Sequence, residues 1–141
     1  MSKPQTPSIR LRIDLSPDSA IGPGKIALLE HIEATGSLSQ AARELGMSYR
    51  RAWLLLDDVN RMFTEPATTA SVGGSGGGGA RLTDLGRAII KTYREIEEAA
   101  ERAASARIAW LESCRRKSPR RSATGKRPVT RSARKSHASR N

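Results

Sequence analysis

Residues 37–53, SLSQAARELGMSYRRAW, contain two helix starts separated by one glycine turn. Ser37 precedes Gln40 by three residues, the spacing of a capping box, which predicts a short alanine-rich helix that ends at Gly46. Ser48 is the predicted N-cap of the next helix. Two helices joined by a short glycine-containing turn are typical of the helix-turn-helix motif, whose second helix enters the major groove of DNA. An ordinary helical hairpin is the alternative.

The second helix of this pair is predicted over residues 49–64, and Pro66 follows its end. Its apolar positions recur at helical spacing and are Ala52, Leu56, Val59 and Phe63. Trp53 and Asn60 flank this apolar face, and we interpret them as a core residue and a buttress.

The segment before the motif predicts one strand and one helix. Residues 9–15, IRLRIDL, alternate apolar and charged side chains, the pattern of a strand with one buried face. The helix follows Gly22-Pro23-Gly24 and closes at Gly36, and its apolar positions are Ile26, Leu28, Leu29, Ile32 and Ala34. We interpret His31 as a surface or packing residue rather than a ligand.

The segment after the motif predicts a hairpin and a long helix. Residues 68–72 and 80–82 flank a glycine-rich tip, GGSGGGG, which predicts a wing of two strands. No Gly-Lys-Ser/Thr follows the glycines, which disfavours a nucleotide-binding phosphate loop. Thr83 and Asp84 are a cap and a first-turn acid, and they open a helix predicted to reach Leu111.

This last helix would be about 42 Å long, which exceeds what a small domain needs for its own core. Five of its residues alternate in steps of four and three, as in the seam of a two-helix coil: Ile89, Tyr93, Ile96, Ala100 and Ala103. We expect them to form the interface of a homodimer. The alternative is a single helix that covers only its own domain.

The charge of the chain is concentrated at one end. The 141 residues contain 25 Lys and Arg against 14 Asp and Glu, and 11 of the basic residues but none of the acids lie after Glu112. Residues 113–141 also lack large apolar side chains, so we expect a disordered basic tail whose partner is a polyanion. The sequence has no apolar run of membrane-spanning length and no secretory signal, so we expect no membrane partner and a cytoplasmic, nucleoid-associated protein.

The predicted fold is mainly α with a small β wing. It is a winged helix-turn-helix domain over residues 9–112, including a long C-terminal dimerisation helix, with disordered segments at 1–8 and 113–141. One cysteine and two histidines cannot build a tetrahedral zinc site, and we expect no metal and no cofactor.

Several segments together resemble one family. They are GPGKIALLEHI from Gly22, TGSLSQAA from Thr35, GMSYRRAW from Gly46, VNRM from Val59, and the glycine-rich wing ending in ARLTDLG. Over about residues 9–105 they are similar to the N-terminal DNA-binding domain of the ModE molybdate-dependent regulators, within the wider LysR-type helix-turn-helix class.

The chain departs from this family in two ways. Full-length members carry C-terminal domains that bind molybdate between subunits, and this chain has only the basic tail in their place, so we expect no molybdate sensor of its own. Regulation would then come from its abundance or from a separate molybdate-binding protein that docks on it. The family usually has bulkier apolar residues after Pro66, whereas residues 67–71 are small and polar, which predicts a weakly packed first wing strand and a mobile wing.

The resemblance implies that the helix starting at Tyr49 reads DNA. Arg50 and Arg51 are the candidates for base reading, because arginine can offer two parallel donors to guanine, and their alternative role is a solvated helix start. Ser48 and Tyr49 would contact phosphates or thymine methyls. The remaining candidate contacts are backbone N–H groups of Ser39 and Gln40 on a phosphate, Arg81 on the DNA backbone or minor groove, and Arg115, Arg116, Lys117, Arg120 and Arg121 in the tail.

The leading hypothesis is therefore a transcriptional regulator that binds double-stranded DNA at a two-fold operator as a homodimer. An architectural, nucleoid-type protein that coats DNA with little sequence preference is the alternative, because of the arginine-rich tail. An enzyme is disfavoured: the sequence shows no spaced His/Asp/Ser or metal constellation, and Cys114 lies beside a basic run with nothing to orient a substrate.

Overall fold

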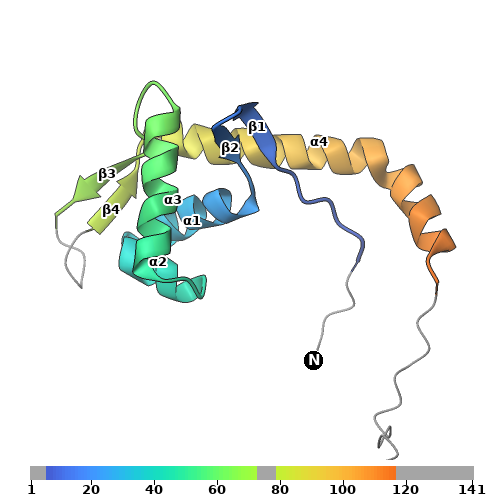
Figure 1. The fold of residues 1–141 in the computed structure, drawn as a ribbon, viewed down its shortest axis with the longest axis horizontal. Helices are drawn as coiled ribbons and strands as arrows, with labels where there is room; N and C mark the ends of the chain where they lie inside the picture. The colour runs from blue at the N-terminus through green and yellow to red at the C-terminus, as the bar shows by residue number, and fades with distance from the viewer. Residues whose placement is uncertain (1–5, 73–78, 117–141) are drawn as a thin grey trace, which may run out of the picture.

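The structure is a computed structural model that describes residues 6–72 and 79–116. The elements, in order, are β1 (Ile13–Ser16), β2 (Ser19–Ile21), α1 (Pro23–Thr35), α2 (Leu38–Glu44), α3 (Tyr49–Met62), β3 (Thr68–Ser71), β4 (Gly79–Leu82) and α4 (Asp84–Cys114) (Figure 1). This arrangement confirms a winged helix-turn-helix that is mainly α, followed by a long C-terminal helix. None of the described helices is apolar and long enough to cross a bilayer.

The N-terminal strand differs from its prediction. Instead of one strand over residues 9–15, β1 begins at Ile13 and pairs antiparallel with β2, in a register that places Ile13 opposite Ile21. β2 stops at Ile21 because Pro23, which has no backbone N–H, begins α1 two residues later. Residues 9–12 therefore have no strand partner, and their alternating pattern does not produce a strand.

The helix-turn-helix forms as the sequence predicts. Ser37 Oγ accepts a hydrogen bond from the Gln40 backbone N–H at 3.2 Å, and Ser48 Oγ accepts one from the Arg51 N–H at 3.2 Å. Gly46 adopts φ 66°, a left-handed conformation that side chains disfavour, and so ends α2. α3 ends at Met62, two residues before the predicted end.

The wing is anchored to α3 by one side chain. Asn60 Oδ1 accepts hydrogen bonds from the backbone N–H groups of Ala67 (2.9 Å) and Thr68 (3.0 Å), and its Nδ2 donates to Thr68 Oγ1 at 3.1 Å. This confirms Asn60 as a buttress. Ala67 and Thr68 are buried, so the prediction that the first wing strand packs weakly is wrong where β3 begins, whereas Thr69 and Ala70 are exposed as it expected. The mobility of the wing stays a prediction, and its glycine tip, residues 73–78, lies outside the described residues.

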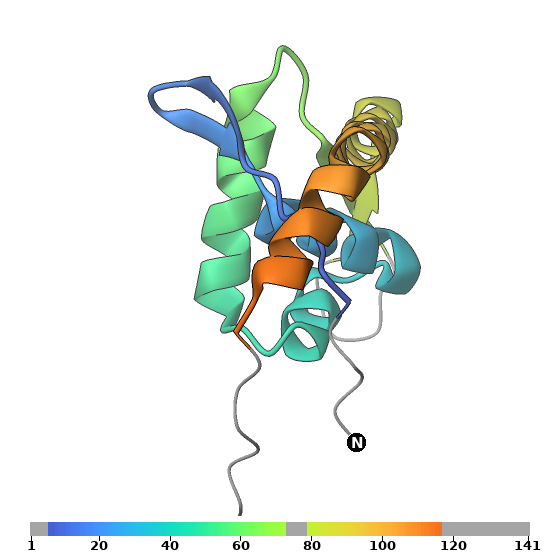
Figure 2. The ribbon, with the colours of Figure 1, turned by 90° about the vertical axis from the view of Figure 1, so that its right-hand side faces the viewer.

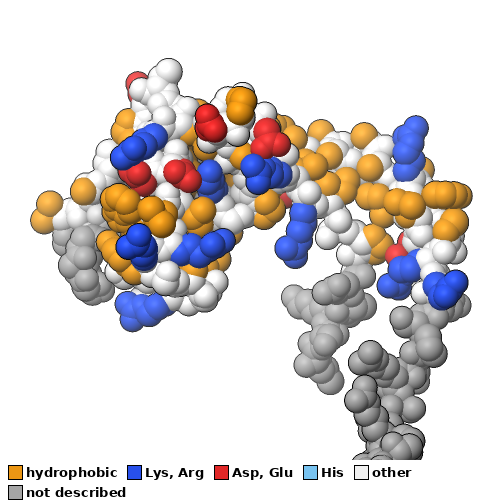
Figure 3. Space-filling view, viewed as in Figure 1, with side chains coloured by type: hydrophobic (Ala, Val, Ile, Leu, Met, Phe, Trp, Pro, Cys, Tyr) orange, Lys and Arg blue, Asp and Glu red, His pale blue; other side chains and the backbone are white. Residues whose placement is uncertain are grey.

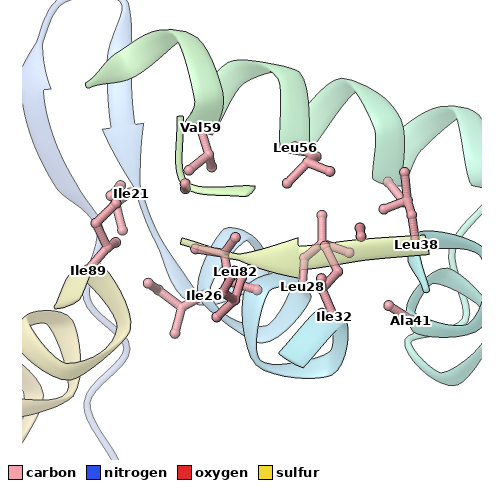
Figure 4. Packing of buried hydrophobic residues seen from close by; sticks show 14 of the residues in the cluster. Ile21, Ile26, Leu28, Ile32, Leu38, Ala41, Leu56, Val59, Leu82 and Ile89 are labelled. Atoms are coloured by element: carbon pink, nitrogen blue, oxygen red, sulfur yellow. The ribbon is translucent and has the colours of Figure 1, made fainter. Parts of the chain in front are cut away.

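The core lies between α1, α3 and β4, and α1 is at its centre (Figure 4). Its fully buried large side chains are Ile26, Leu28, Leu29, Ile32 and Val59. Trp53, which we interpreted as a core residue, is 48% exposed, so that prediction is wrong. Trp53 follows the buried Ala52 by one residue, a rotation of about 100° on a helix, which carries it out of the core.

α4 is about 46 Å long at 1.5 Å per residue, and only its first ten residues contribute buried side chains. Tyr93 is one of these, and its hydroxyl donates to the Leu11 carbonyl at 2.6 Å. Burial, with a smaller contribution from Glu97, raises the pKa of the Tyr93 phenol, so the donor stays protonated. Arg94 bonds Glu30 on α1, which fixes α4 against the domain.

The C-terminal half of α4 extends beyond the domain (Figure 1), and its last turns bend away from the direction of its first part (Figure 2). Ile89 and Tyr93 are 8% and 2% exposed within the core of their own domain, so assigning them to a dimer seam is wrong. Ile96 is 41% exposed, Ala100 half-buried and Ala103 exposed. α4 also includes Ser113 and Cys114, which the predicted boundary placed in the tail.

Candidate nucleic-acid interface

The outward side of α3 carries the predicted reading residues. Ala52, Leu56 and Val59 face the core, which leaves Tyr49, Arg50, Arg51 and Trp53 exposed on the first two turns. Tyr49 is 56% exposed. The Ser48 cap fixes the point at which α3 begins, and so fixes where these side chains project.

Among the described residues, Arg50 and Arg51 have no acidic partner: no carboxylate oxygen lies within 4.0 Å of either guanidinium. Arg43 and Arg81 likewise pair with no described acid, whereas several other arginines of the domain do. Arg61 lies 3.0 Å from Asp57, and Arg94 bonds both Glu30 and Glu97. The start of α3 is therefore a point of uncompensated positive charge in the described structure.

Charge changes sign along α3. The two arginines occupy the first turn, the apolar side chains of Trp53 and Leu54 follow, and Asp57 and Asp58 come one turn later. Figure 3 shows this sequence over α3, with blue side chains at its lower end, an orange cluster above them and red side chains beyond. Because Asp57 lies 3.0 Å from Arg61 and Asp58 lies 3.8 Å from Lys25, the attraction for a polyanion is concentrated on the N-terminal half of α3 and falls off beyond it.

The start of α2 lies beside the start of α3 (Figure 1). Ser39 is half-buried and Gln40 is exposed there. The Gln40 backbone N–H is already engaged by Ser37 Oγ, so the prediction that this N–H is available to a phosphate is wrong. The backbone N–H of Ser39 and the side chain of Gln40 remain as candidates.

The wing is hydrogen-bonded to the segment just before α2. The Ala80 N–H donates to the Gly36 carbonyl at 3.0 Å, and Ser37 forms an isolated bridge with Gly79. Arg81 lies between the buried residues Ala80 and Leu82 on β4 and is exposed. A Cβ at Gly79 would lie 2.2 Å from Ser71 Oγ, so glycine is required where the wing strands meet the motif.

Of the predicted tail contacts the structure describes only Arg115 and Arg116, and it does not bring these two to this face. Arg115 lies 3.0 Å from Glu112 at the end of α4, Arg116 is exposed, and α4 carries both away from α3 (Figure 1). Lys117, Arg120 and Arg121 lie outside the described residues. In the described ranges no three His, Cys, Asp or Glu side chains gather as metal ligands.

Relatives of known name match the region that forms this domain. The chain is 40% identical over 88 residues to the "Molybdenum transport protein ModE" of Azotobacter vinelandii, covering 62% of this chain and 33% of the relative. It is 35% identical over 95 residues to the "DNA-binding transcriptional dual regulator ModE" of Escherichia coli (strain K12), covering 67% and 36%. The described residues form a ModE-type domain.

A third relative is the "Molybdenum-pterin-binding protein MopB" of Rhodobacter capsulatus, 46% identical over 77 residues, covering 55% of this chain and 28% of the relative. The chain thus spans about a third of the length of these relatives. No family model matches the chain. The ModE relatives of Yersinia pestis and Escherichia coli are named as transcriptional regulators and not as enzymes, which fits a domain that binds rather than catalyses.

One exposed residue on the candidate face of this ModE-type domain, Trp53, was not among the predicted DNA contacts. Trp53 follows Tyr49 by four residues, so the two share one side of α3, and with Arg50 they line a shallow surface hollow. The i,i+4 spacing from Tyr49 was the signal that could have placed Trp53 outside the core.

Proposed function

We propose that the ModE-type domain binds operator DNA as part of a transcriptional regulator and inserts the N-terminal half of α3 into the major groove. The observation that carries this proposal is the pair of exposed arginines without acidic partners, Arg50 and Arg51, at the capped start of the second helix of the motif. Positive charge is unfavourable at a helix N-terminus, so two arginines there are best explained by an anionic partner.

Each candidate residue has a distinct role in this proposal. Arg50 and Arg51 each donate two hydrogen bonds to guanine O6 and N7, which distinguishes this base from the others. Ser48, Tyr49, Ser39 and Gln40 position the domain on phosphates, and Tyr49 also reaches thymine methyls. The wing and tail add contacts that carry no base information: Arg81, Arg115, Arg116, Lys117, Arg120 and Arg121.

We further propose that two copies bind one operator, held together by α4. The support is the extent of α4 beyond its own domain and the exposure of Ile96 at the point where it leaves. Two helix-turn-helix units must read half-sites about 34 Å apart, which requires a fixed spacing between them. The dimer contact is restricted to residues from Ile96 onward, because Ile89 and Tyr93 are buried within their own domain.

Residues 1–141 are proposed to bind DNA without responding to molybdate themselves. The chain covers about a third of the length of its relatives, and an oxyanion effector needs converging donors on a rigid frame. The fraction of operator DNA occupied by this chain would then be set by the abundance of the chain, or by a separate molybdate-binding protein that docks on it. Titration of molybdate into the purified chain should release no heat and leave DNA affinity unchanged, and a saturable micromolar response would contradict the proposal.

The experiment that tests DNA reading is selection of bound fragments from genomic DNA, followed by affinity measurements at physiological salt. A regulator should prefer a selected site over a scrambled one by about 10³ or more. Nearly equal affinities would instead indicate the architectural, nucleoid-type protein favoured by the basic tail. In either case the protein acts where the DNA is, in the cytoplasm at the nucleoid.

A further inference from the structure

Trp53 is a large apolar side chain exposed on the face that meets DNA. It is 48% exposed, and Leu54 beside it is 47% exposed. Neither is needed by the core, which α3 contacts through Ala52, Leu56 and Val59. An exposed tryptophan at the centre of a candidate interface calls for a partner with apolar surface of its own.

The surroundings of Trp53 place it within the DNA footprint rather than beside it. Tyr49 and Arg50, one turn earlier, line one hollow together with Trp53, so a partner that contacts Arg50 also contacts Trp53. Asp57 and Asp58, one turn later, pair with Arg61 and Lys25, so the uncompensated positive charge of α3 ends before them. Trp53 and Leu54 are thus the exposed apolar positions of α3 between the arginines and the two aspartates, and of the two only Trp53 lines the hollow with Arg50.

The major groove offers one apolar group to such a side chain. Among the four bases only thymine presents a methyl group there, and apolar side chains are the ones that contact it. Trp53 lies three residues after Arg50, a rise of about 4.5 Å, and successive base pairs are about 3.4 Å apart. A helix that places Arg50 on a guanine would therefore present Trp53 to a base one or two steps away.

We propose that Trp53 is a specificity-determining residue that reads the 5-methyl group of a thymine in the operator. The proposal rests on the function proposed above, in which α3 lies in the major groove. It assigns the apolar part of the recognition sequence to Trp53, whereas the arginines read guanine.

The test uses a DNA site selected by the wild-type chain and replaces each thymine in turn with deoxyuridine, which pairs identically but lacks the methyl group. One replacement should weaken wild-type binding about fourfold, the factor that corresponds to about 0.8 kcal/mol for one buried methylene-sized group. The same replacement should not change the DNA affinity of the Trp53→Ala variant. Because the uridine series uses the wild-type protein, it does not depend on whether a variant folds.

The matched control is Trp110→Ala, which removes the chain's other tryptophan, also exposed but near the far end of α4. Because Trp110 lies in the part of α4 proposed to hold the dimer, this control is judged by the ratio of its affinities for the thymine and deoxyuridine sites and not by its affinity alone. It should retain the fourfold uridine effect. The role of Trp53 would be overturned if no deoxyuridine replacement changed the affinity of the wild-type chain, or if the replacement weakened binding by Trp53→Ala as much as by the wild type. If the wild-type chain does not distinguish selected from scrambled DNA at all, the proposed function itself fails, which is a different result.

Discussion

Replacing Asn60 by alanine should destabilise the domain more than any other change to a partly exposed side chain. The Asn60 carboxamide is the partner of two backbone N–H groups, those of Ala67 and Thr68, at 2.9 and 3.0 Å. Both residues are buried at the junction between α3 and the wing, where water has little access. Without Asn60 these two donors lose their acceptor and the base of the wing loses its attachment to α3.

The cost follows from those contacts. A buried donor left without a partner costs about 1–3 kcal/mol, and Asn60 is itself only half-buried, so partial hydration offsets some of this. We therefore expect the free energy of unfolding to fall by about 3 kcal/mol. For a domain of about 100 residues this lowers Tm by about 15 °C.

Urea unfolding monitored by circular dichroism measures the effect, with Asn60→Asp as the matched control. Aspartate keeps an acceptor for both backbone N–H groups and loses only the Nδ2 bond to Thr68 Oγ1, so it should cost about 1 kcal/mol. Amide exchange should also become faster at Ala67 and Thr68 in Asn60→Ala and stay slow in Asn60→Asp. A loss under 1 kcal/mol for alanine, or an equal loss for both variants, would refute the reasoning.

Three further changes test other parts of the structure. Gly86→Ala should cost about 2–3 kcal/mol of stability, because its Cβ would lie 2.2 Å from the Ala67 carbonyl oxygen. The control Gly24→Ala, whose Cβ would have no atom within 4 Å, should be neutral or stabilising. Equal stability of the two variants would contradict this packing. Ile96→Lys should yield folded monomers in sedimentation experiments, and persistent dimers would move the interface elsewhere. Truncation after Glu112 should flatten the salt dependence of DNA binding by about 0.9 in the slope of log K for each lost phosphate contact, and an unchanged slope would give the tail another role.

The local signals in this sequence were sufficient wherever one residue determines the structure. The Ser37 and Ser48 caps and the glycine that ends α2 are each visible as a residue type at a fixed spacing, and each forms as expected. The predicted length of the N-terminal strand was wrong because the extent of β1 depends on its partner β2, which ends where α1 begins. Pattern alone does not report the length of a pairing strand.

The candidate site was predictable only where local sequence decides the exposure of a residue. The exposure of Arg50 and Arg51 follows from their place on the first turn of α3, before its first buried position at Ala52, but their lack of an acidic partner among the described residues depends on the positions of distant carboxylates. For Tyr93 the periodicity was misleading: its spacing fits a coiled-coil seam, but the side chain is buried in the core of its own domain. Helical periodicity shows which residues share a face, and tertiary packing decides what covers that face.

The most direct test of the central claim, that the start of α3 reads DNA sequence, compares Arg50→Ala and Arg51→Ala with the wild type on selected and on scrambled DNA. At least one variant should lose about 1–3 kcal/mol of binding free energy on the selected site and much less on scrambled DNA, because a lost base contact removes discrimination as well as affinity. Equal losses on both DNAs, or no loss on either, would contradict the assignment of α3 as the reading helix.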